Sequence, residues 1–117
     1  MLDNNKCIIV FGLDEEEMNQ LKMADLRVIE VTDKMASMRV GDIIDGFDMV
    51  RYDVRLPKEK IILFNNFDNV ELKATIEKVR QITKEGILAV VTPTSINWSF
   101  EHLVSHLLEE RDWMKRR

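Results

Sequence analysis

The sequence predicts an α/β fold in which two βαβα half-repeats form a mainly parallel four-stranded sheet flanked by helices. Two short β-branched and aromatic runs, Ile8–Phe11 and Ile61–Phe64, are typical of buried strands. Each run is followed by a helix-start signal, and later by a Val-Thr pair that leads into another helix. Alternating strands and helices favour parallel strands covered by helices. Numbered along the chain, the simplest strand order is 2-1-3-4.

The first helix is predicted from the residues that follow Ile8–Phe11. Asp14 is a typical N-cap, and Glu17 stands three residues later as in a capping box. Leu13 and Met18 flank the cap at the spacing of a hydrophobic staple. We therefore expect a helix that starts after Asp14 and packs on the first strand.

The rest of the first half predicts a strand, a loop and a short helix. The strand is expected at Leu26–Val31, and the helix carries Val40 and Ile43 on one face before Asp45-Gly46 ends it. Residues 47–60 fit either a strand or a longer helix, so we treat them as a connector.

The second half repeats these signals. Ile61–Phe64 aligns on Ile8–Phe11 with an offset of 53, and after one inserted residue Asp68 and Glu71 reproduce the capping box. Val91-Thr92 then matches Val31-Thr32 with an offset of 60. The chain is thus expected to be a single domain, 1–117, with half-repeats at about 1–46 and 61–117.

Composition narrows the classes of protein. The 117 residues are 45% hydrophobic and 32% charged, as in ordinary globular proteins and unlike disordered chains. A formal net charge of -4 argues against a nucleic-acid partner, which requires a basic face. No apolar run is long enough for a membrane span, so we expect a cytoplasmic protein without a membrane partner.

No catalytic or metal-binding set is predicted, and no cofactor. Cys7 opens an apolar strand and is expected to be a buried, inert thiol. His102, His106 and Glu110 share one helix edge, but Leu103 stands where a zincin motif requires Glu. We interpret the two histidines as solvated residues.

A polar turn before the last helix is the first part of a predicted ligand site. Thr92, Thr94, Ser95 and Asn97 lead from the carboxyl end of a strand to a helix N-terminus, where an anion is favoured. The alternative is that these side chains satisfy their own turn. Next along the chain, Trp98 is expected to close a buried staple with the helix.

The second part of the predicted site is the switch point between the first and third strands. Ligands of open parallel sheets bind where strand order reverses, outside the carboxyl ends of the strands. Gly12, Asn65 and Asn66 flank that point in the 2-1-3-4 order. A small anion or carboxylate is the expected ligand.

The second half of the chain, about Ile61 to Asp112, resembles a small uncharacterised bacterial family known as a domain of unknown function. The resemblance rests on Leu63–Asp68, on Thr92-Pro93-Thr94, and on Trp98 with the following Ser99, Phe100 and Leu103. It implies no activity, cofactor or catalytic residue.

Two functions remain open from the sequence. The preferred hypothesis is a non-catalytic module that binds a protein partner or another copy of itself, because outer strands of a small sheet need cover. The alternative is a domain or enzyme that binds a small anionic ligand at the carboxyl edge of the sheet.

Overall fold

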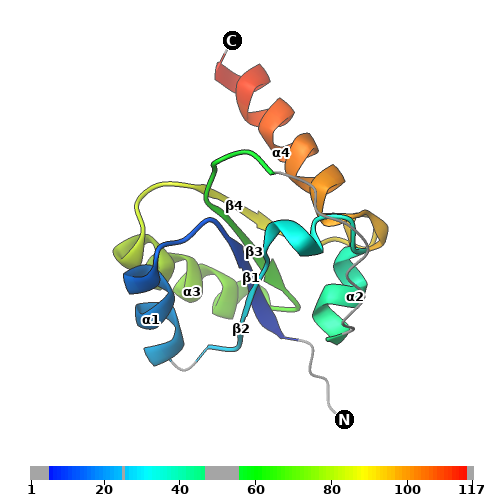
Figure 1. The fold of residues 1–117 in the computed structure, drawn as a ribbon. Helices are drawn as coiled ribbons and strands as arrows, with labels where there is room; N and C mark the ends of the chain where they lie inside the picture. Colours follow the sequence, from blue (N-terminus) through cyan, green and yellow to red (C-terminus); the bar gives the residue numbers. More distant parts are fainter. Residues whose placement is uncertain (1–5, 25, 47–55, 116–117) are drawn as a thin grey trace. The chain divides into compact units, whose positions relative to one another are not determined.

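A computed structural model describes residues 6–24, 26–46 and 56–115. Its elements follow each other as strand, helix, strand, 3-10 helix and helix in each half of the chain (Figure 1). Residues 47–55 of the predicted connector lie outside the described part. The first set is β1 Cys7–Phe11, α1 Glu15–Met23, β2 Val28–Glu30, η1 Asp33–Met35 and α2 Val40–Asp45. The second set is β3 Ile61–Asn65, α3 Asn69–Ile82, β4 Ile87–Val90, η2 Ser95–Asn97 and α4 Phe100–Lys115.

The four strands form one open sheet in the order β2-β1-β3-β4, which confirms the predicted order. The sheet is mixed, however, and not mainly parallel. β1 pairs in parallel with β2, and β3 with β4, but β1 and β3 are antiparallel at the centre. The prediction was wrong because the runs Ile8–Val10 and Ile61–Phe64 are apolar and buried throughout, and such runs carry no signal of strand direction.

The described residues divide into two compact units, and each unit draws on both halves of the chain. The first unit comprises Met1–Val31 and Lys58–Val91, and so contains the whole sheet with α1 and α3. The second comprises Thr32–Pro57 and Thr92–Arg117, with η1, α2, η2 and α4.

In the first unit, α1 and α3 lie side by side on one face of the sheet (Figure 1). The core between them is built from alternate residues of the central strands and the inner faces of the helices, as the period of two predicts. Its buried members are Ile8, Val10, Met18, Leu21, Ile62, Phe64 and Val79. The residues between them on β1 and β3, among them Ile9 and Leu63, are also buried.

Capping explains where the helices of the sheet unit begin. Asp14 accepts from the Glu17 amide at 2.8 Å, and the Glu17 carboxylate accepts from the Asp14 amide at 3.0 Å, so the predicted capping box is confirmed. Asp68 caps α3 through the Glu71 amide, also at 2.8 Å. The Glu71 carboxylate instead pairs with Lys6, so only the Asp68 half of the second box is formed as a cap.

The register of β1 and β3 places Ile9 opposite Leu63 at the centre of the antiparallel pair, and Cys7 opposite Asn65 at one end. Gly12 directly follows β1 and Asn66 directly follows β3, and both have positive φ, 83° and 67°.

In the second unit, the segments that precede α2 and α4 form a short antiparallel bridge between Arg39 and Ser99. The Val40 amide donates to the Trp98 carbonyl at 2.8 Å, and the Phe100 amide donates to the Met38 carbonyl at 2.9 Å. The first bond joins residues 58 positions apart and the second joins residues 62 positions apart, one on either side of the Arg39–Ser99 bridge. α2 ends at Gly46 in the left-handed conformation, as its sequence predicts.

Candidate functional site

The antiparallel centre of the sheet separates the residues of the predicted crevice. Gly12 follows Phe11, which pairs with the first residue of β3, whereas Asn65 pairs with Cys7 at the other end of β1. Five residues at about 3.3 Å each put roughly 15 Å or more between Gly12 and Asn66. These residues therefore do not form the expected switch-point crevice, because the carboxyl ends of the antiparallel strands β1 and β3 lie at opposite ends of the sheet.

The backbone of Glu59 and Lys60 packs directly against the turn at Gly12. A Cβ at Gly12 would overlap the Glu59 carbonyl oxygen and lie 3.1 Å from the Glu59 carbonyl carbon and 3.3 Å from the Lys60 Cα. Glycine is required here for close approach of two backbone segments and for a positive φ. Backbone packing therefore explains why position 12 is glycine, and no bound ligand is needed to explain it.

At the opposite end, Asn65 is a buried residue and Asn66 is an exposed one. Burial raises the pKa of the Cys7 thiol, although the Arg27 charge and a hydrogen bond with Asn65 act to lower it. A buried thiol with a raised pKa is a poor nucleophile, which agrees with the expected inert role. Asn66 occupies the left-handed region, which asparagine tolerates better than other residues with a Cβ.

The polar turn before α4 satisfies its own hydrogen bonds. The Ser95 hydroxyl accepts from the Thr92 amide at 2.9 Å, and the Thr92 hydroxyl accepts from the Ser95 amide at 2.9 Å. The side-chain oxygen Oδ1 of Asn97 accepts from the Arg39 guanidinium at 2.9 Å. Thr94 is exposed. The amides of Thr92 and Ser95 are thus engaged within the turn, as the alternative to an anion site predicts.

Trp98 is partly buried, so it is not the core residue that the sequence analysis expected. Its ring contacts His102 and His106 edge-on, with centroids 4.7 and 5.2 Å away. The predicted helix start is confirmed, because the Ser99 hydroxyl accepts from the His102 amide at 3.2 Å. An indole against two exposed imidazoles covers one turn of α4.

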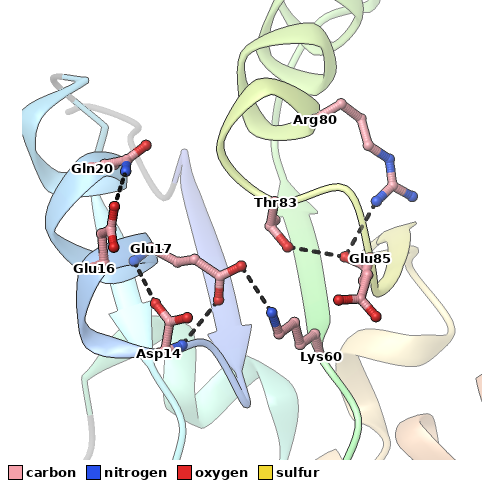
Figure 2. A network of polar contacts seen from close by, with 8 residues as sticks. All are labelled: Asp14, Glu16, Glu17, Gln20, Lys60, Arg80, Thr83 and Glu85. Atoms are coloured by element: carbon pink, nitrogen blue, oxygen red, sulfur yellow. Dashed lines mark hydrogen bonds and ion pairs between the residues drawn. The ribbon is translucent and has the colours of Figure 1, made fainter.

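A charged cluster at the Gly12 end of the sheet was missed by the sequence analysis. Lys60, directly before β3, donates to the Glu17 carboxylate at 2.9 Å, and the Glu17 side chain is only 11% exposed (Figure 2). Burial acts to raise the pKa of Glu17, but hydrogen bonds from the Asp14 amide, Lys60 and Thr83 together lower it. The hydrogen bond to Glu17 raises the pKa of Lys60. Both groups are therefore charged at neutral pH.

The opposite end of the sheet carries a matching pair. Lys6, directly before β1, lies 2.5 Å from the Glu71 carboxylate of α3. In both pairs a lysine from one half of the chain meets the third residue of a helix from the other half. A Lys directly before each apolar strand was the available signal, but its partner depends on the antiparallel direction.

No group of three or more His, Cys, Asp or Glu side chains in residues 6–24, 26–46 and 56–115 is placed to hold a metal ion. A shallow hollow on the outer face of α3 is lined by Asn69, Val70, Lys73, Ala74 and Glu77. It contains none of the predicted ligand-binding residues.

Comparison with known proteins yields one match. Residues 60–114 match the model of a family described as a domain of unknown function, DUF3783. The match extends from the residue before β3 nearly to the end of α4, so it covers the second half of the chain. No curated protein and no solved structure matches the chain. No helix in the described part is long and apolar enough to cross a membrane.

Proposed function

We propose that this protein is a non-catalytic module for protein interaction or self-association, and that its binding element is the outer edge of β4. This strand ends the sheet order, and no other strand of the described residues pairs with its outer side. The Ile87 amide donates to the Lys60 carbonyl at 2.8 Å and the Val91 amide to the Phe64 carbonyl at 3.0 Å. In a parallel ladder of this register, the backbone groups of Leu88 and Val90 point outward.

The side chains of β4 support this assignment. Ile87, Leu88, Ala89 and Val90 contain no charge, and Val90 is 49% exposed. An exposed apolar edge strand is a template for another strand unless charged residues guard it. At the other edge, β2 carries Glu30, which is exposed. Only one of the two edges of the sheet is therefore protected against pairing.

We further propose that the two halves of the chain are repeats of one unit. The support is the order of elements, which is the same in both halves, and the offset of 60 that relates Val31 to Val91. The Val31 amide donates to Val10 as the Val91 amide donates to Phe64. The reciprocal Lys60–Glu17 and Lys6–Glu71 pairs relate Lys6 to Lys60 and Glu17 to Glu71 by an offset of 54. Under the offset of 60 that applies to the later strands, Val90 corresponds to Glu30, and β4 to β2.

The alternative function, binding of a small anionic ligand, rests on the turn Thr92–Asn97. The engaged amides of Thr92 and Ser95 favour the interaction module. Amide NMR of the whole protein separates the two functions. Raising the protein concentration from about 10 μM to 1 mM, a range typical of weak association, should shift the Leu88 and Val90 amides first. A titration with inorganic phosphate is the second experiment. If phosphate shifts only the amides of Thr92–Asn97, and raising the protein concentration shifts no β4 amide, the interaction module is contradicted.

A further inference from the structure

We infer that the partner of the β4 edge is a second copy of this chain, paired antiparallel about a two-fold axis at Ala89. The inference rests on the proposed function and names the partner of that same edge. It follows from the spacing of the outward backbone groups, from the side chains of β4, and from the contrast with β2.

The outward backbone groups of β4 are complementary to themselves. Leu88 and Val90 are two residues apart, and both direct an amide and a carbonyl away from β3. In an antiparallel pair, Leu88 of one copy lies opposite Val90 of the other, and each such pair exchanges two hydrogen bonds. The two-fold axis makes the second pair identical, so all four groups on each copy are satisfied. Pairing centred on Leu88 or Val90 alone would satisfy fewer groups.

The side chains fit the same register. Ala89 meets its own copy in a non-hydrogen-bonded pair, where opposite Cα atoms are only about 4.5 Å apart and a small side chain is favoured. Leu88 packs on the core between the sheet and its helices, and Val90 pairs with Phe64 on that same face. Leu88 of the second copy would therefore cover the exposed Val90. No charged residue of β4 is buried by this contact.

The equivalent edge of β2 shows how the chain prevents such a contact. Val28 and Glu30 of β2 occupy the positions of Leu88 and Val90, because the Ile8 and Val31 amides bond β1 and β2 in the same pattern. Self-pairing of β2 would bury the Glu30 carboxylate against Val28 of the second copy. β4 has valine at that position. The pairing is thus open at one edge and blocked at the other, which limits assembly to a dimer.

The size of the contact sets its strength. A pair of four-residue strands buries less than the roughly 1,200 Å² of a standard stable interface, so the dimer belongs to the weak, transient class. We expect dissociation in the micromolar to millimolar range.

Disulfide trapping in the whole protein tests the register directly. Ala89→Cys places two sulfur atoms across the axis at a Cα separation that suits a disulfide. Ala74→Cys is a stringent control, because Ala74 lies on α3 and is more exposed than the half-buried Ala89. Cys7 is buried in both variants. Under mild oxidation, the Ala89→Cys chain should form covalent dimers at least ten times faster than Ala74→Cys. Equal rates would overturn the inference.

Sedimentation of two charge variants tests the contrast between the edges. Val90→Glu gives β4 the residue of β2 and should weaken dimerisation at least tenfold, with the circular dichroism spectrum and melting curve confirming a folded chain. Glu30→Val opens the second edge and should extend the dimer into larger assemblies. A wild-type dimer that Val90→Glu leaves unchanged would overturn the inferred contact and the assignment of binding to the β4 edge, and would leave self-association through another surface. A wild-type chain that stays monomeric at 1 mM would overturn the inference and leave only a different protein partner.

Discussion

Replacement of Gly12 by alanine should be among the most damaging small substitutions in the sheet unit. The residue has φ of 83°, and its backbone passes directly against Glu59 and Lys60. Gly46, at the end of α2, is a matched control with φ of 82°, and no other atom of the described residues lies within 4 Å of the place where its Cβ would stand. The two substitutions share the cost of a positive φ and differ in the overlap.

The expected magnitudes follow from this comparison. A left-handed conformation costs a residue with a Cβ about 1–2 kcal/mol, which is the whole expected effect of Gly46→Ala. Gly12→Ala adds an overlap with backbone atoms, which cannot rotate away, so β1 and β3 must shift. Overpacking of this kind typically costs a further 1–3 kcal/mol. Gly12→Ala should therefore lower the free energy of unfolding by about 2–5 kcal/mol.

Urea denaturation of both variants, followed by circular dichroism, measures the difference. The midpoint should fall much further for Gly12→Ala than for Gly46→Ala, with similar slopes. Equal midpoints would refute the close approach of the Gly12 turn to Glu59. A larger effect of Gly46→Ala would show that the left-handed cap of α2 matters more than the backbone contact.

Two further outcomes are expected. Glu17→Gln should cost about 1–2 kcal/mol of stability at neutral pH. Because folding lowers the pKa of Glu17, the difference from wild type should vanish as pH falls below about 4, as acid melts would show. The raised pKa of Lys60 keeps the Lys60–Glu17 pair charged until pH exceeds about 10. Ser95→Ala should cost about 1–2 kcal/mol of stability in thermal melts, because it leaves the Thr92 amide without its acceptor. Thr94→Ala, at the exposed neighbouring position, should change stability by less than about 0.5 kcal/mol. Equal effects of the two substitutions would contradict the role of the Ser95 hydroxyl.

Local signals in the sequence predicted the elements well. Asp14, Asp68 and Ser99 each stand before a helix and accept from an amide of its first turn, as expected from their residue types. The strand order 2-1-3-4 also followed, because each helix returns the chain to a strand beside its predecessor. The capping contacts join residues that are only three positions apart in the sequence.

Strand direction at the centre of the sheet is what the sequence did not contain, and the candidate site depended on it. With β1 and β3 antiparallel, Gly12 and Asn65 lie at opposite ends, so no shared crevice forms there. The same direction gives each end one lysine and one helix N-terminus, which close it through Lys60–Glu17 and Lys6–Glu71. Both ends of the sheet are thus occupied by the chain's own charges, and its helix face by α1 and α3. The two outer strands differ in one exposed position, where β2 carries Glu30 and β4 carries Val90. An apolar residue at an otherwise unguarded edge is a feature of the sheet unit that its own folding does not explain.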